Sequence, residues 1–381
     1  MTQDLIKQIQ SLRQSKVIVY FTSDRLPIMA SIAEDAVRPL YDHLLSVGKN
    51  KKIDLFIYSR GGDVSVPWRI VSMFREFCDE FSVLVPYKAH SAATLLSLGA
   101  DKIFMGKKAE LGPIDPTLTK QSMGESASPP QEISVEDVSS YISFMRDKVN
   151  INDQSSLARV ATILANHLTP LTLGSVNRQN SHIRLVARKL LTSRKEKLDE
   201  AKIITIIETL IEKIYFHGHA IGRREAKELG LPIETNDKLE ELLWSLFLEY
   251  EIFFKLNEPI DPTIVLLNKE EEHLDNFPIA IIESENKLHS FSPQADIKKV
   301  RQIPSPPQIN INLNLSMPPN LDPKKIPQEA QKLLQQMANQ VSQEIPKLVQ
   351  QEIIRQSREV GINIKAYGGV WQEKSKGEES K

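Results

Sequence analysis

The chain has 381 residues, room for one large or two smaller domains, and 41% of them are hydrophobic, which can supply a sizeable core. Lys and Arg together number 48 against 49 Asp and Glu, so no strong net charge attracts nucleic acid or anionic lipid. Cys78 is the only cysteine, which excludes an internal disulfide and any multi-cysteine metal cluster.

The N-terminal residues and the apolar runs bear on location. The segment Met1–Lys7 has an early acidic residue and no apolar core, unlike a secretory signal. No apolar run approaches the roughly 20 residues needed to cross a bilayer. We therefore expect a cytoplasmic globular protein without a membrane span.

Strand and helix patterns alternate through the first hundred residues. Lys16–Phe21 and Ile53–Tyr58 have the β-branched and aromatic content of strands. Val64–Phe77 predicts a helix, because its apolar side chains recur at three- and four-residue steps. Phe81–Val85 is another short apolar run, and the small apolar residues Ala92–Ala100 are typical of a buried helix. This alternation predicts an α/β fold with a mainly parallel sheet.

Two turns follow the second and third apolar runs, and each opens a helix. The first contains Gly61-Gly62, and glycine lets backbone N–H groups approach a ligand closely. The second places Ser91 at a helix start, where free N–H groups can stabilise a developing oxyanion. The pair predicts a nucleophile facing an oxyanion hole. The same pattern also occurs in α/β proteins without catalytic activity, in which serine is an ordinary helix N-cap.

The ordered set of motifs resembles the Clp-fold serine peptidases. It consists of Ser-Arg-Gly-Gly at 59–62, Ser-Ala-Ala at 91–93, Ala-Asp-Lys-Ile-Phe-Met at 100–105, Glu-Leu-Gly-Pro-Ile-Asp-Pro at 110–116 and a later element over 216–231. Within that group the chain is most similar to the serine dehydrogenase proteinase family, a relative of signal peptide peptidase A and the Clp proteolytic subunit. The likeness covers about residues 14–290 and implies a Clp/crotonase-like α/β fold of repeated ββα units.

The resemblance also implies an activity. A serine peptidase of this type would hydrolyse a protein substrate through an acyl-enzyme on Ser91, without cofactor or metal. The oxyanion would be bound by the backbone N–H of Gly61 or Gly62 together with that of Ala92. Strand edges beside such a site usually hold an extended peptide. Clp-fold substrate channels form between subunits, so the resemblance further implies a homo-oligomer.

The general base is left open by the sequence, although a serine hydroxyl needs one to accept its proton. The Clp subunit carries a histidine where this chain reads Pro-Ile-Asp-Pro at 113–116, with Asp115 as the titratable residue. Asp115 could orient a base or cap the following turn. Relatives of signal peptide peptidase use a downstream lysine, which points to Lys148. That lysine can act only if burial lowers its pKa; otherwise it is a solvated helix residue.

Histidines supply the other candidate bases. His217 and His219 lie near the position of the third Clp triad member, and His167 ends a predicted helix. Isolated histidines are more often structural than catalytic. His90 is adjacent to Ser91, but neighbouring residues in a turn usually point their side chains apart.

Two other function classes remain open. Crotonase enzymes share this fold and bind acyl-coenzyme A thioesters with the same kind of oxyanion hole, but they use a carboxylate in place of a serine nucleophile. Ser91 favours the peptidase. A catalytically silent scaffold, or an assembly protein activated by a partner, fits the missing histidine and the long C-terminal extension.

The composition changes near residue 291. We expect a peptidase domain over 1–290, a proline-rich linker over 291–326 and a helical extension over 327–381. Within the linker, the alternating stretch Ile309–Leu315 has the period of a half-buried strand. In the extension, Pro346 interrupts an apolar repeat and predicts two shorter helices or a kink. We expect assembly or adaptor binding from this extension.

Overall fold

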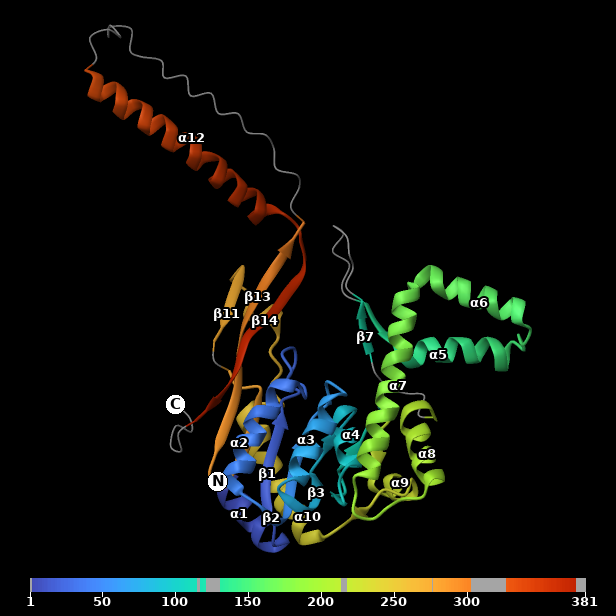
Figure 1. Ribbon diagram of the computed structural model, residues 1–381. Coiled ribbons are helices and arrows are strands. Elements are labelled where there is room, and N and C mark those ends of the chain that lie inside the picture. The colour runs from blue at the N-terminus through green and yellow to red at the C-terminus, as the bar shows by residue number, and fades with distance from the viewer. Residues whose placement is uncertain are drawn as a thin grey trace. The chain divides into compact units, whose positions relative to one another are not determined.

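The computed structural model describes residues 2–114, 117–120, 131–213, 218–275, 277–302 and 327–374 (Figure 1). Asp115, His217 and the alternating stretch 309–315 lie outside these residues. The chain forms two compact units. The first comprises Met1–Ile260, Asn276–Pro293 and Gly368–Lys381, and the second comprises Asp261–Asp275 and Gln294–Tyr367.

A twisted sheet forms the centre of the first unit, in the order β10-β5-β3-β2-β1-β12-β13. Its members are β10 (Ile233–Glu234), β5 (Lys102–Met105), β3 (Cys78–Val85), β2 (Asn50–Tyr58), β1 (Lys16–Thr22), β12 (Ala280–Ser284) and β13 (Leu288–Arg301). Strands β10, β5, β3, β2 and β1 run parallel, whereas β12 is antiparallel to both β1 and β13. The predicted α/β class with a mainly parallel sheet is confirmed.

Both faces of this sheet are covered, and strand β1 shows how. Ile18 and Tyr20 belong to one apolar core, whereas Val17, Val19 and Phe21 belong to the other. Successive side chains of a strand point to opposite faces, so an uninterrupted apolar run is needed where both faces are buried. All five side chains are at most 1% exposed, and burying each contributes about 1.5–3 kcal/mol.

Helices supply the partners of these strands. The first core is covered by α2 (Val37–Val47), α3 (Val66–Arg75), α4 (Ala92–Leu98), α7 (Pro170–Thr192) and α8 (Glu200–Glu208). The second is covered by α1 (Thr2–Arg13) and α10 (Asp237–Phe254). Figure 1 shows α2 and α3 in front of the sheet and α10 behind it. The predicted helices at 64–77 and 92–100 correspond to α3 and α4.

Smaller elements complete the first unit. They are η1 (Glu34–Ala36), β4 (Lys88–Ala89), β6 (Glu110–Leu111), β7 (Thr117–Lys120), β8 (Gln131–Ser134), α5 (Val135–Ser143), η2 (Phe144–Lys148), α6 (Gln154–His167), η3 (Thr209–Lys213), β9 (Ile221–Gly222) and α9 (Arg223–Glu228). Strands β4, β6 and β9 form a second sheet beside the glycine turn, and β7 pairs with β8.

A buried histidine pair joins α2 to the β12–β13 hairpin. His43 Nδ1 hydrogen-bonds Ser284 Oγ at 2.7 Å, and His43 Nε2 hydrogen-bonds His289 Nδ1 at 3.1 Å. Burial lowers the pKa of His43 to about 3, and the neighbouring His289 and Lys287 add to this shift. Burial also lowers the pKa of His289. Both rings are therefore neutral at neutral pH.

The C-terminal third differs from the expected linker and helical extension. Strand β13 continues through the start of the expected linker, and β14 (Glu359–Glu373) pairs with it. The second unit also contains α11 (Pro262–Val265) and β11 (Glu271–Leu274), which is antiparallel to β13. Helix α12 (Gln328–Gln356) is one 29-residue helix that continues through Pro346. Among the residues described, no helix is long and apolar enough to span a membrane.

Candidate active site

Ser91 occupies a strained turn between β4 and α4. Its backbone has φ 49° and ψ −112°, on the positive-φ side where a residue with a side chain is uncommon. The turn is held on both sides, because the His90 N–H donates to Ser59 O at 3.0 Å and the Leu95 N–H donates to Ser91 O at 2.9 Å. Such strain costs about 1–3 kcal/mol and clusters at functional sites. A strained strand-to-helix turn is also how the nucleophile elbow presents its serine.

The glycine turn packs directly against this serine. A Cβ atom built on Gly61 would lie 2.7 Å from Ser91 Cβ, 2.9 Å from His90 O and 3.1 Å from Ala92 N. Gly61 also has φ +108°, which glycine alone adopts without strain. The Ser59 N–H donates to Lys88 O at 3.0 Å and fixes the register of the two turns. The two motifs predicted to form one site therefore lie in contact.

Gly61 and Gly62 differ in whether their backbone N–H is already hydrogen-bonded. The Gly61 N–H donates to Ser59 Oγ at 3.0 Å, and Gly61 is buried. Gly62 is exposed, and its place is fixed by Ile32, whose N–H donates to Gly61 O and whose carbonyl accepts from the Asp63 N–H. No described residue accepts a hydrogen bond from the N–H of Gly62 or Ala92. Within the described residues these two N–H groups thus have no backbone acceptor.

His90 turns its side chain toward β6. Its Nε2 hydrogen-bonds Glu110 Oε1 at 3.1 Å, and its ring atoms lie 3.1 Å from where a Cβ on Gly112 would stand. Burial lowers the pKa of His90, with Arg60 and Lys88 adding to the effect and Glu110 opposing it. The imidazole is therefore neutral at neutral pH. Within the described part of the chain, no side chain hydrogen-bonds Ser91 Oγ.

A charged cluster around Asp24 fixes the entrance to both turns. Its carboxylate accepts from Tyr58 OH at 2.8 Å, Arg60 Nε at 2.9 Å and Lys88 Nζ at 2.9 Å. Burial alone would raise the pKa of Asp24, but these three hydrogen bonds outweigh it and the pKa is lowered. Sequence reasoning missed this cluster, because Asp24 follows a strand without any motif around it.

The predicted bases that are described do not contact Ser91. Lys148 lies on η2 and is exposed, and His167 at the end of α6 is exposed. His219 is exposed and hydrogen-bonds the Glu225 carboxylate at 3.0 Å. Asp115 and His217 lie outside the described residues. The structure thus unites the serine and the glycine turn, while the base stays a prediction.

Comparison with known proteins agrees with this geometry. Residues 2–147 match the family of ClpP-like SDH-type serine proteinases. The chain is 29% identical over 239 residues to the uncharacterized protein MJ0137 of Methanocaldococcus jannaschii, covering 61% of this chain and 73% of the relative. It is 23% identical over 246 residues to the uncharacterized protein MJ1495 of the same organism, covering 62% of this chain and 74% of the relative.

Solved structures that resemble the chain share little sequence with it. ClpP1 from Listeria monocytogenes is 14% identical to this chain, with a TM-score of 0.31. The match covers 61% of this chain and 99% of the ClpP1 chain. A peptidase from Plasmodium falciparum is 13% identical to this chain, with a TM-score of 0.32. The match covers 60% of this chain and 98% of the peptidase chain. The family resemblance seen in the motifs is confirmed by the match of residues 2–147 to the ClpP-like SDH-type serine proteinases.

Proposed function

We propose that this protein is a serine peptidase that cleaves protein substrates through an acyl-enzyme on Ser91. The observation that carries the proposal is the strained Ser91 backbone in direct contact with Gly61. An ordinary helix N-cap adopts a relaxed extended conformation, which Ser91 does not. The N–H groups of Gly62 and Ala92, which have no acceptor among the described residues, would bind the oxyanion.

The proposed reaction follows from this arrangement. Ser91 Oγ attacks the carbonyl carbon of the scissile peptide while its proton passes to a general base. The carbonyl oxygen becomes an oxyanion that accepts hydrogen bonds from Gly62 and Ala92. Each such donor typically contributes about 10²–10³ in rate. The base then gives its proton to the leaving amine, and water hydrolyses the ester that remains on Ser91.

The general base is proposed among candidates from the sequence and one residue that the structure adds, His90. Lys148, His167, His217 and His219 are the candidates from the sequence, with Asp115 as a residue that could orient the base. His90 joins them because its neutral ring is oriented by Glu110; an Nε2 proton donated to that carboxylate leaves Nδ1 free to accept one. We expect substitution of the true base to reduce labelling of Ser91 by about 10²–10⁴.

A second function, a scaffold or a partner-activated enzyme, is favoured by one observation. Ser91 Oγ has no hydrogen-bond partner among the described residues, as expected if a partner or a second subunit completes the site. By family likeness we also propose that the protein acts in the cytoplasm as a homo-oligomer and that its C-terminal extension binds an adaptor.

Labelling with a fluorophosphonate serine probe tests the proposal. Wild type is compared with Ser91→Ala and with Ser97→Ala, a matched control in the same helix whose hydroxyl donates to Ala93 O at 2.8 Å. We expect labelling of wild type and Ser97→Ala and none of Ser91→Ala. The variants Lys148→Ala, His219→Ala, Asp115→Asn and His90→Ala then identify the base. A wild type that never reacts would refute an autonomous enzyme and support the scaffold.

A further inference from the structure

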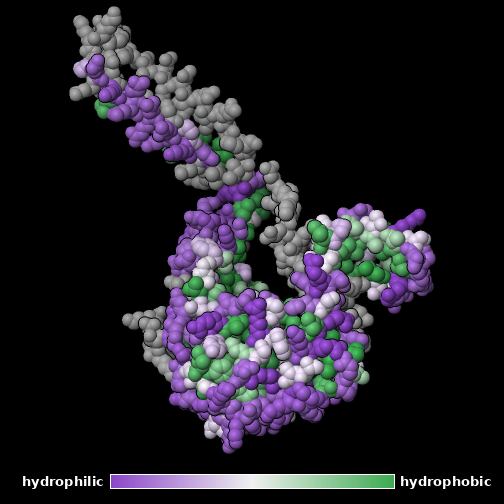
Figure 2. Space-filling model, viewed as in Figure 1, coloured by the Kyte–Doolittle hydropathy of each residue, from purple (hydrophilic) through white to green (hydrophobic). Residues whose placement is uncertain are grey.

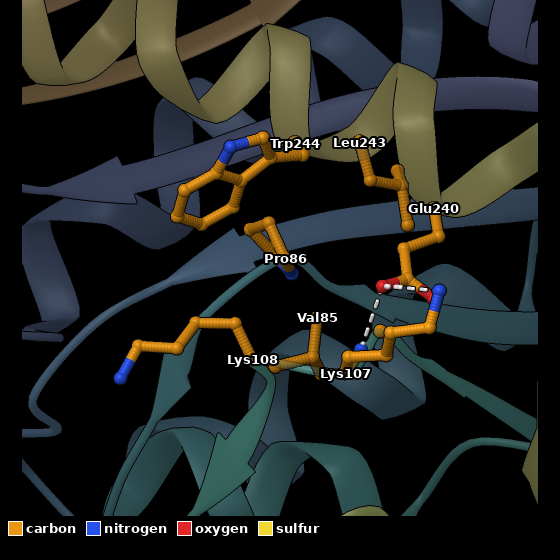
Figure 3. A pocket seen from close by; sticks show the side chains of 8 residues that line it. Val85, Pro86, Lys107, Lys108, Glu240, Leu243 and Trp244 are labelled. Atoms are coloured by element: carbon orange, nitrogen blue, oxygen red, sulfur yellow. Dashed lines mark hydrogen bonds and ion pairs between the residues drawn. The ribbon is translucent and has the colours of Figure 1, made fainter. Parts of the chain in front are cut away.

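A cavity of about 200 Å³ lies between α10 and the segments that follow β3 and β5 (Figure 3). Its lining residues are Val85, Pro86, Gly106, Lys107, Lys108, Glu240, Leu243 and Trp244. Small-molecule sites usually measure roughly 300–1,000 Å³. This cavity is smaller, and its size suits one large side chain of a longer ligand.

The walls of the cavity are apolar and preorganised. Figure 3 shows Trp244 and Leu243 on α10 facing Pro86 across the opening. The Trp244 ring stacks on Phe247 with centroids 5.0 Å apart, so it is fixed although 37% of the residue is exposed. An aromatic or large aliphatic group between Trp244 and Pro86 would bury apolar surface on both sides.

An apolar stripe leaves the cavity along α10. Trp244, Leu248 and Ile252 are spaced by four residues and therefore share one face of the helix. They are 37%, 36% and 73% exposed. A ligand that fills the cavity can thus continue along the helix, which indicates a peptide segment instead of a small metabolite.

The charged residues at the rim of the cavity differ in whether they have a partner of opposite charge. Glu240 accepts from the Lys107 N–H at 2.9 Å and lies near Lys107 Nζ at 4.0 Å and Arg223 Nη1 at 3.6 Å. Lys108 instead places its ammonium over the Tyr87 ring, 4.6 Å from the centroid. No carboxylate among the described residues forms an ion pair with Lys108. Figure 3 shows Lys108 directed away from Glu240, so a ligand carboxylate there would meet a cation that has no ion-pair partner among the described residues.

We infer that this cavity is a docking site for a peptide segment of a partner protein. The anchor is a large apolar, preferably aromatic, side chain that enters beneath Trp244. An Asp or Glu next to the anchor pairs with Lys108. The site is distinct from Ser91, and binding there involves no bond cleavage.

The test uses ¹⁹F NMR of the full chain labelled with 5-fluorotryptophan. The protein has three tryptophans, so Trp244→Phe assigns the resonance of interest. The probe is the capped peptide Gly-Ser-Phe-Asp-Ser-Gly, titrated into the millimolar range. Its two controls replace Phe by Ala or Asp by Lys.

We expect the Phe-Asp peptide to shift the Trp244 resonance saturably. Each control peptide and the Lys108→Glu variant should bind about tenfold or more weakly. Lys238→Glu makes the same charge change on α10 at an exposed lysine outside the cavity, and it should keep wild-type affinity. No shift, equal responses to the three peptides, or equal weakening by both glutamate variants would overturn the inference. Because the readout does not involve Ser91, it is independent of the labelling assay.

Discussion

Replacing Gly61 by alanine should disable the site through a single methyl group. The new Cβ would stand 2.7 Å from Ser91 Cβ, whereas carbon atoms prefer separations of about 3.5–4.0 Å. The Ser91 turn therefore has to move by about 1 Å, a displacement that can cost about 10²-fold in rate. The positive φ of Gly61 adds at least about 1–2 kcal/mol of backbone strain for any L-residue.

The assay compares rates of fluorophosphonate labelling in Gly61→Ala and Gly48→Ala. Gly48 also has a positive φ, of 71°, but a Cβ there meets nothing within 4 Å. Both variants bear backbone strain, and only Gly61→Ala moves Ser91. We expect about 10²-fold slower labelling in Gly61→Ala and a wild-type rate in Gly48→Ala. Wild-type labelling of Gly61→Ala, or equal losses in both, would refute the reasoning.

Two further predictions concern stability. The folded-state pKa of His43 is about 3, below the roughly 6.5 of an unfolded histidine, so its stabilising contribution is complete above pH 6.5 and lost as the pH falls toward 3. His43→Gln should therefore flatten the fall in urea-unfolding free energy by up to about 1.4 kcal/mol per pH unit. Trp371→Ala should lower the unfolding free energy by about 2 kcal/mol, because its ring contacts Tyr20 and Phe291 and its N–H donates to Asp35 at 3.1 Å.

Each stability prediction has its own control. His219→Gln makes the same substitution at an exposed histidine and serves as the matched control. A His43→Gln variant with an unaltered pH profile would contradict the buried neutral pair. For Trp371→Ala the control is Tyr367→Ala, which removes another aromatic ring from β14. An unchanged unfolding midpoint of Trp371→Ala would contradict the packing role of Trp371.

The first half of the fold was predictable because its signals are local. Strand β1 is apolar from Val17 to Phe21, and helix α4 consists of Ala, Leu, Ser and Thr that are all buried, which is the pattern of an element enclosed in a core. The contact between Gly61 and Ser91 was predictable for a related reason. Parallel strands β2 and β3 are neighbours, so the turns at their carboxyl ends open at one edge of the sheet.

The rest of the fold and the orientation of His90 depend on pairing between strands that are distant in sequence. The prolines beyond residue 305 indicate a linker that begins near residue 291, yet β13 continues to Arg301 because β11 pairs with Ala295–Lys298. The alternation of Val360, Ile362 and Ile364 is a strand signal for β14. The expected helical extension over 327–381 overlooked this signal. The orientation of His90 toward Glu110 depends on the register of β4 with β6, which no spacing along the chain encodes.

The Asp24 cluster has a consequence for how this sequence can change over time. One carboxylate holds Arg60 in the glycine turn, with the proposed donor Gly62, and Lys88 in the strand that leads to Ser91, the proposed nucleophile. A substitution at Asp24 leaves two cations without their partner and loosens both halves of the site at once. In divergent copies of the gene, Asp24, Arg60 and Lys88 are therefore expected to be inherited as a set or replaced as a set.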